Sequence, residues 1–128
     1  MTAWTRDELD RIGSADELRL TTVRPDGGLR ARVTIWVVRH GDDLYIRSYR
    51  GPGGSWFRHA RERREGHIQA GGVDKDVMLA DASHQFDDQI DAAYRAKYRR
   101  YGSTYVNPMV APQARATTIK LVPRANGS

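Results

Sequence analysis

Short turns divide this chain of 128 residues into brief apolar stretches, and their spacing limits the folds that it can adopt. The segments 25–28 and 40–43 read Pro-Asp-Gly-Gly and His-Gly-Asp-Asp, which are compositions of tight turns, and Gly71-Gly72 marks a further turn or bulge. Between these turns apolar residues alternate with polar ones, as in half-buried strands. Because short turns join antiparallel neighbours, we expect a largely antiparallel sheet.

The pattern along the chain predicts helix, three strands, helix, two strands, helix and strand. The six strands are expected at 18–23, 29–39, 44–49, 65–72, 73–82 and 117–122. The helices are expected from a capping box at Thr5 and Glu8 to Gly13, and then at 55–64 and 86–101. Residues 102–112 are expected to form a loop because Asn107-Pro108 disfavours a helix, and the tail 123–128 is expected to be disordered. The predicted fold class is therefore α+β, mainly β, with a six-stranded antiparallel barrel and flanking helices in one domain over 1–128.

Composition excludes several classes of protein. Cysteine is absent, which excludes disulfides, thiolate metal sites and a cysteine nucleophile. No apolar run approaches the length of a membrane span and the N-terminus lacks the apolar core of a signal peptide, so we expect a cytoplasmic protein without a membrane partner. The pI of 9.9 would suit nucleic acid, but no nucleic-acid-binding motif occurs, so nucleic acid is not the expected partner.

The excess positive charge lies in one segment, residues 47–64. This segment holds six arginines and one acid, Glu62, so its formal charge of +5 equals that of the whole chain. It begins as a predicted strand, crosses a glycine-rich turn at 51–54 and enters a predicted helix. Because a helix N-terminus offers free N–H groups and a partial positive charge, this arrangement is typical of a site for phosphate or carboxylate.

Individual residues of the segment suit anion binding. Gly51 and Gly54 let the backbone bend and approach a ligand closely. Ser55 is expected to act as the N-cap of the following helix. Arg50 and Arg58 flank the turn and can form bidentate contacts. A solvated hairpin whose arginines serve only solubility is the alternative interpretation, since neither the Walker pattern nor the G-x-G-x-x-G fingerprint occurs.

The strand expected at 29–39 carries an unusual second face. Arg32, Thr34 and Trp36 lie on it, so it is neither plainly apolar nor plainly solvated. A large aromatic residue there indicates a covered surface, which is either a ligand groove or a subunit interface. An ordinary barrel strand with one arginine reaching to solvent remains the alternative.

No catalytic group is evident from the sequence. The four histidines match no zinc spacing and are expected in turns or on the surface; they are His40, His59, His67 and His84. His59, one helical turn after the glycine turn, is the only one that we assign to the candidate site. The acid pairs, including Asp74 and Asp76, are interpreted as turn and capping residues.

Ser48 and Ser55 are interpreted as hydrogen-bond donors to a ligand, because the nucleophile-elbow pattern is absent. Tyr94 and Tyr98, at helical spacing, are expected to pack in the core. An anion-binding barrel without a catalytic group of its own suits a redox cofactor that itself supplies the chemistry.

Three stretches resemble a bacterial family of short proteins known as domain of unknown function 2255. They are Val33-Thr-Ile-Trp-Val-Val-Arg-His-Gly-Asp-Asp-Leu-Tyr-Ile-Arg-Ser48, Gly66-His-Ile-Gln-Ala-Gly-Gly72 and Asp91-Ala-Ala-Tyr-Arg-Ala-Lys-Tyr98, and the likeness covers nearly the full length. More distantly, the succession of Ser48, the glycine turn, Trp56-Phe57 and Gly71-Gly72 is similar to that in flavin- and deazaflavin-binding split barrels, the pyridoxamine-phosphate-oxidase-like proteins.

This resemblance implies a homodimeric split barrel that binds flavin mononucleotide or a deazaflavin near the glycine turn. It implies an oxidoreductase that reduces a small molecule by hydride from the cofactor. Phosphate contacts are expected from Arg32, Ser48, Arg50, Gly54, Ser55 and Arg58, with Trp36 and Trp56 walling the ring and Gly51 and His59 nearby.

Two other functions remain open at this point. One is a cofactor-free small-molecule binder or cyclase-like barrel, whose apolar pocket Trp36, Tyr45 and Tyr94 would line. The other is a non-catalytic dimeric module in which Trp36 lies at the interface.

Overall fold

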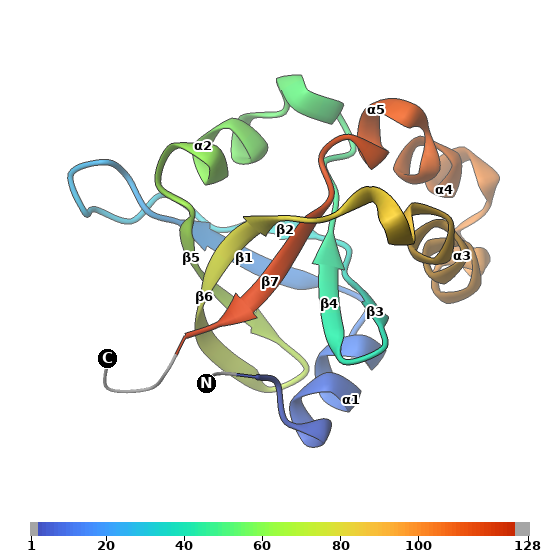
Figure 1. Ribbon diagram of the computed structural model, residues 1–128, viewed down its shortest axis with the longest axis horizontal. Helices are drawn as coiled ribbons and strands as arrows, with labels where there is room; N and C mark the ends of the chain where they lie inside the picture. The colour runs from blue at the N-terminus through green and yellow to red at the C-terminus, as the bar shows by residue number, and fades with distance from the viewer. Residues whose placement is uncertain (1–2, 125–128) are drawn as a thin grey trace.

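The computed structural model describes residues 3–124 and has the shape of a strongly curled sheet with helices around it (Figure 1). The strands are β1 (Leu18–Thr22), β2 (Val33–Ile35), β3 (Val38–His40), β4 (Asp43–Ile46), β5 (Glu65–Ala70), β6 (Val73–Asp81) and β7 (Ile119–Pro123). The α-helices are α1 (Arg6–Ser14), α2 (Ser55–Arg63), α3 (Asp87–Lys97), α4 (Ser103–Val110) and α5 (Pro112–Arg115). Three short 3₁₀ turns are η1 (Gly51–Gly53), η2 (His84–Phe86) and η3 (Arg99–Tyr101).

All neighbouring strands are antiparallel, in the order β2-β1-β5-β6-β7-β4-β3. The sheet curls into a half-barrel. Helix α2 covers one end of it and α1 covers the other, above and below the sheet in Figure 1. The fold class is therefore α+β, as the sequence predicts, and the arrangement is that of a split barrel. The predicted number of six strands was wrong, because the sheet has seven.

The seventh strand arises because the stretch expected as one strand at 29–39 is broken at Val37. The backbone of Val37 hydrogen-bonds to side chains at the C-terminal end of α3 instead of to a neighbouring strand. Its N–H donates to the Tyr98 hydroxyl at 3.1 Å, and its carbonyl accepts from Lys97 Nζ at 2.6 Å. With these groups satisfied, the chain leaves β1 at Ile35 and joins β4 at the opposite end of the sheet as β3.

Two apolar clusters stabilise this arrangement. The first fills the half-barrel with side chains from every strand except β3, together with Leu9 and Ile12 of α1 and Phe57 and Ala60 of α2. The second lies between β3–β4 and the helices α3 and α4, which stand together at one side of the sheet (Figure 1). Tyr94 and Tyr98 are fully buried in it, which confirms their predicted core role.

The region after β6 differs from the sequence-based expectation. The helix predicted at 86–101 is divided into η2, α3 and η3, and the loop predicted at 102–112 contains α4 and α5. Pro108 lies inside α4, where burial of Val106 and Met109 against the second cluster outweighs the hydrogen bond that proline cannot make.

Pro123, expected in a disordered tail, ends β7, and Arg124 donates its backbone N–H to Asp76 O at 3.0 Å. The rest of that predicted tail, 125–128, lies outside the described residues. Over residues 3–124, none of the helices has the length and apolar character needed to cross a membrane.

Candidate functional site

The glycine turn links the end of β4 to α2 through a tightly folded backbone. Gly51 adopts φ 71°, a conformation that favours glycine, and its N–H donates to Ser48 O at 3.0 Å. Gly54 lies so close to Ser48 that an added Cβ would stand 2.5 Å from Ser48 Oγ. The turn therefore brings Ser48 and the start of α2 together, as the sequence predicts.

The N-terminus of α2 lacks a side-chain cap. The prediction that Ser55 is the N-cap was wrong, because the helix already begins at Ser55 and Gly54, in an extended conformation, is the N-cap. Within the described residues, no side-chain cap hydrogen bond forms at this helix end. Because the first N–H groups of a helix have no intrahelical acceptor, those at Ser55, Trp56 and Phe57 are available to an external acceptor.

Two cavities adjoin at this helix end. The larger, of about 480 Å³, is lined by Val33, Thr34, Ile35, Ser48, Tyr49, Arg50, Gly53, Gly54, Ser55 and Trp56. The smaller, of about 180 Å³, is lined by Thr34, Ile35, Trp36, Arg47, Tyr49, Trp56, Tyr105 and Met109. Four residues are common to both linings, so the two cavities lie next to each other between β2, the glycine turn and the first turn of α2, and we refer to them together as the hollow.

The structure brings most of the sequence-predicted site residues to this hollow. Those in the lining of the larger cavity are Ser48, Arg50, Gly54, Ser55 and Trp56. Trp36 lines the smaller cavity instead. Gly51, the first residue of the turn, is buried and lines neither cavity.

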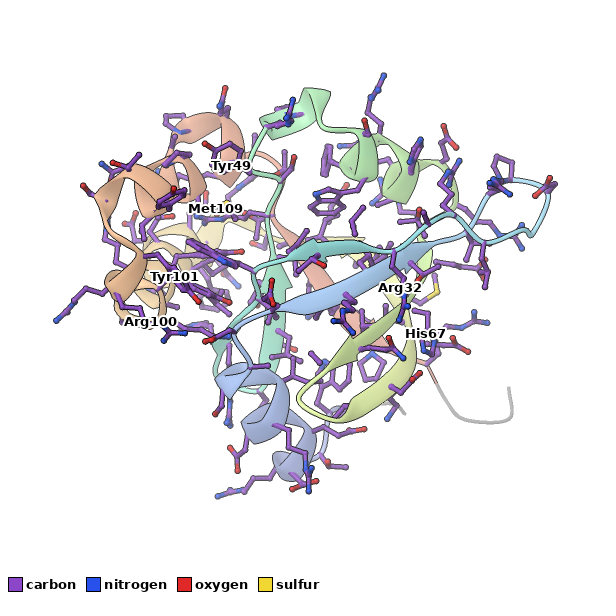
Figure 2. All side chains as sticks on the ribbon, turned by 180° about the vertical axis from the view of Figure 1, so that it is seen from behind. Arg32, Tyr49, His67, Arg100, Tyr101 and Met109 are labelled. Atoms are coloured by element: carbon purple, nitrogen blue, oxygen red, sulfur yellow. The ribbon has the colours of Figure 1, made fainter. Side chains whose placement is uncertain are left out.

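Arg32, Arg58 and His59 do not line either cavity. Arg32 donates to Gln69 Oε1 at 2.7 Å, on the part of the sheet that carries His67. Figure 2 shows Arg32 and His67 close together and well separated from Tyr49 and Met109. Arg32 therefore does not line the hollow in this structure.

The six arginines of the segment 47–64 do not form one patch. Arg47 is buried, while Arg63 and Arg64 pair with Glu65 and Asp81, acids that lie outside the segment. The excess charge of the segment is therefore not gathered at the glycine turn. Of the six, only Arg50 reaches the larger cavity, where it is exposed to solvent.

Arg47 is a feature of the site that the sequence analysis missed. Its side chain has no exposed surface, and its Nη1 donates to Asp91 Oδ1 at 2.5 Å and to the Met109 carbonyl at 3.0 Å. Its Nε donates to Thr118 Oγ1 at 2.9 Å. A charged residue directly after the apolar run Leu44–Ile46 was the only signal in the sequence, and it does not identify the partner.

Trp36 is half-buried and rests on Tyr98. The two rings are parallel to within 3°, with centroids 3.9 Å apart. Because Tyr98 covers one face of the indole, the smaller cavity reaches its other face or its edges. Tyr45 and Tyr94, expected beside Trp36 in a cofactor-free pocket, are instead buried in the second core cluster and line neither cavity.

His67 lies between two carboxylates on the outer surface of the sheet, away from the hollow. Its Nδ1 is 2.8 Å from Asp76 Oδ1, and its Nε2 contacts Asp74 Oδ1. Burial opposes the charged imidazole, but the hydrogen bonds to Asp76 and Asp74 outweigh it and raise the pKa of His67. Asp74 and Asp76 are therefore ion-pair partners within β6, and their interpretation as turn and capping residues was wrong.

Comparison with known proteins places the chain in a sequence family. A family model described as "Uncharacterized protein conserved in bacteria (DUF2255)" matches residues 8–121. None of the curated protein sequences matches the chain significantly.

Several solved structures share the fold at low sequence identity. An F420-H2-dependent reductase (FDR-A) superposes with a TM-score of 0.61 at 14% identity, over 84% of this chain and 93% of the reductase. A candidate pyridoxamine 5'-phosphate oxidase from Listeria innocua gives 0.61 at 13% identity, over 91% and 90% of the two chains. HutZ, the haem storage protein from Vibrio cholerae, gives 0.62 at 13% identity, over 94% and 91%. These similarities confirm the split-barrel fold.

Proposed function

The chain belongs to the DUF2255 family, and we propose that it is a split-barrel oxidoreductase that binds flavin mononucleotide or a deazaflavin in the hollow beside α2. The observation that carries this proposal is the uncapped helix N-terminus, which opens into a cavity lined by both polar and aromatic groups.

The polar end of the larger cavity fits a phosphate group. Ser48, Ser55 and the free N–H groups of α2 are donors, and Arg50 adds a positive charge. A Cβ on Gly53 would meet no atom within 4 Å, so the backbone there leaves space for a ligand. The donor set therefore matches the anionic end of either cofactor.

The other end of the larger cavity fits the edge or face of a planar ring. Trp56 and Tyr49 contribute aromatic surface, and Val33 and Ile35 of β2 contribute apolar surface. The resemblance predicts that Trp36 also contacts the ring, but Trp36 lines the smaller cavity and not the larger one. We therefore assign the ring contact to Trp56 and Tyr49.

A bound flavin or deazaflavin supplies hydride transfer, while the residues around it bind and orient. Ser48, Arg50 and Ser55 hold the anionic group, and the aromatic side chains exclude water from the ring. The structural relatives include a reductase that depends on F420-H2, which supports this choice of chemistry, and a haem storage protein, which shows how widely the fold is used.

We also propose that the chain forms a homodimer, as its resemblance to the split barrels implies. Trp36 is the candidate contact, since it is large, aromatic and only half-buried. Sedimentation of the Trp36→Ser variant tests this role, because an unchanged dimer excludes Trp36 from the interface.

Titration of the protein with flavin mononucleotide, deazaflavin and haem tests the cofactor assignment. Quenching of tryptophan fluorescence is expected with one of the first two, and the Trp56→Phe variant should lose most of the quenching. Trp4 is a matched control, because its indole is buried and donates to Leu121 O at 2.9 Å, away from the hollow. Binding weaker than about 1 mM for both phosphorylated cofactors would contradict the proposal.

A further inference from the structure

The wall of the smaller cavity is mostly aromatic and apolar. Trp36, Tyr49, Trp56 and Tyr105 contribute aromatic side chains, and Met109 adds a flexible apolar one. Figure 2 shows Tyr49 and Met109 close together on the helical side of the sheet. The residues that we assign to the phosphate line the larger cavity and not this one. The smaller cavity must therefore recognise a ligand in another way.

The lining of the cavity offers a ligand no charged partner. Arg47 is part of it, but its side chain has no exposed surface, and its guanidinium donates to Asp91 Oδ1 at 2.5 Å and to Thr118 Oγ1 at 2.9 Å. A carboxylate entering the cavity would lose its hydration without forming an ion pair, which is unfavourable. Aromatic side chains can bind an organic cation, but none of the residues in this lining is acidic, and Arg50 lines the adjoining cavity. The lining therefore favours an uncharged ligand.

Trp36 gives the cavity a flat wall that is held from behind. Tyr98, which is fully buried, stacks on the indole with ring centroids 3.9 Å apart and planes within 3° of parallel. The Tyr98 hydroxyl also accepts a hydrogen bond at 3.1 Å from the backbone N–H of Val37, the residue after Trp36. Because these contacts exist without a ligand, the indole needs little reorganisation when a ring binds. A planar aromatic ring gains more from such a wall than an aliphatic ring of similar size does.

The volume of the cavity limits the size of a ligand. An apolar cavity of roughly 150 Å³ binds one benzene ring. At about 180 Å³, the smaller cavity has room for one aromatic ring with a small substituent, and not for a fused ring system.

We propose that the smaller cavity binds a single uncharged aromatic ring, which its aromatic wall recognises without an ion pair. Binding in this cavity depends only on its own lining. Its role as the substrate end of an oxidoreductase rests on the proposed function, because the shared wall of Trp56 and Tyr49 would place such a ring next to the cofactor.

Titration of the cofactor-free protein with benzyl alcohol, followed by the three indole N–H resonances in NMR spectra, tests this binding. Trp36 lines only the smaller cavity, Trp56 lines both cavities, and Trp4 is buried away from them. The resonances of Trp36 and Trp56 should shift with a dissociation constant of about 5 mM or tighter, and that of Trp4 should not. A shift of Trp56 alone, equal shifts of all three or no shift would overturn the proposal.

Four further ligands test the specificity of the cavity. Cyclohexylmethanol tests the aromatic wall and should bind at least about threefold more weakly than benzyl alcohol. Benzoate tests the negative charge, tetramethylammonium the positive charge and 2-naphthylmethanol the size, and each should bind at least about tenfold more weakly. Equal affinity for cyclohexylmethanol, benzoate or 2-naphthylmethanol would contradict the proposal. Tighter binding of tetramethylammonium would overturn it by showing an aromatic cage for a cation.

Two exposed apolar side chains provide a matched pair of variants. Tyr105 lines the cavity and Leu29 does not, and they are 60% and 64% exposed, so neither substitution should unfold the protein. Tyr105→Ala is expected to weaken benzyl alcohol binding about fivefold, and Leu29→Ala to leave it unchanged. Equal effects of the two substitutions would contradict the assignment to this cavity.

A repeat of the titration in saturating flavin mononucleotide separates the two proposals. Unchanged or tighter binding of benzyl alcohol supports a substrate site next to the cofactor, and competition overturns that role by showing that the cofactor itself fills the smaller cavity. Benzyl alcohol binding without any cofactor binding would leave the cavity assignment intact and remove the proposed oxidoreductase function. Cofactor binding without benzyl alcohol binding would do the reverse.

Discussion

Arg47, just after β4, and Asp91, in α3, form a buried ion pair in which Arg47 Nη1 lies 2.5 Å from Asp91 Oδ1. The pair joins the end of β4 to α3, and Arg47 Nη1 also donates to the Met109 carbonyl of α4 at 3.0 Å. Arg47 therefore helps to position Met109 in the wall of the smaller cavity. Because both side chains are buried, each needs the other to remain charged in the interior.

Removal of one member of this pair should destabilise the fold strongly. Asp91→Asn is expected to lower the free energy of unfolding by about 3–5 kcal/mol, because Arg47 is then left buried without its main partner. Asp10→Asn is the matched control: Asp10 pairs with Arg39 at 2.7 Å on the surface, and its loss should cost at most about 1 kcal/mol. Urea unfolding of both variants measures the difference, and similar costs would contradict the structural role of Arg47.

The close approach of Gly54 to Ser48 predicts a steric effect. Gly54 has φ −65° and ψ 139°, which any residue adopts, so alanine is disfavoured there only by the contact with Ser48 Oγ. Gly54→Ala should destabilise by about 1–3 kcal/mol, and adding Ser48→Ala should restore most of the loss. Gly53→Ala, whose Cβ would meet nothing within 4 Å, should change stability by less than about 0.5 kcal/mol. Thermal melts of the three variants test this, and a double variant no better than Gly54→Ala would refute the contact.

His67 should make stability depend on pH. Asp76 and Asp74 raise the pKa of His67 in the folded protein above its unfolded value of about 6.5, against the opposing effect of burial. The stabilisation is then fully present below about pH 6.5 and is lost as pH rises through the folded pKa. The difference in stability between wild type and His67→Gln should therefore decrease as pH increases. The midpoints of urea unfolding measure this difference.

His59→Gln serves as a control for the loss of an imidazole, because His59 makes no ion pair among residues 3–124. A constant gap between wild type and His67→Gln across this range would show that the two carboxylates do not hold a charged His67.

Local features of the fold could be predicted from the sequence. The capping box at Thr5 and Glu8 is present, and the helix expected at 55–64 lies at Ser55–Arg63. Turn composition predicted the antiparallel hairpins, and helical spacing predicted burial of Tyr94 and Tyr98. Each of these depends on residues close together in the chain, where pattern and propensity act directly.

Features that depend on distant residues could not be predicted. The strand breaks at Val37 because the Val37 N–H donates to the hydroxyl of Tyr98, 61 positions later. Arg47 can be buried because it forms an ion pair with Asp91, 44 positions later. A local sequence pattern does not predict which distant side chain will form a hydrogen bond or an ion pair with a given backbone or charged group. For the same reason the sequence predicted one cluster of arginines, whereas Arg63 and Arg64 pair with acids beyond that segment.

The part of the candidate site that was predicted is the part formed by consecutive residues. Ser48, Arg50, Gly54, Ser55 and Trp56 come together because one turn carries them all. The smaller cavity was not predicted, since Tyr105 and Met109 come from α4, in a segment expected to be a loop.

The most direct test of the proposed phosphate site is the ratio of the affinities for flavin mononucleotide and riboflavin. The same ratio is measured for a deazaflavin and its unphosphorylated form. If the N-terminus of α2 and Arg50 hold the phosphate, the phosphorylated form of at least one pair should bind about tenfold tighter or more, a gain of about 1.4 kcal/mol. Arg50→Ala should reduce this ratio, and Arg6→Ala, which removes the same charge from α1, should not. A ratio near one for both pairs in the wild-type protein, or a ratio that Arg50→Ala leaves unchanged, would contradict a phosphate-binding role for this site.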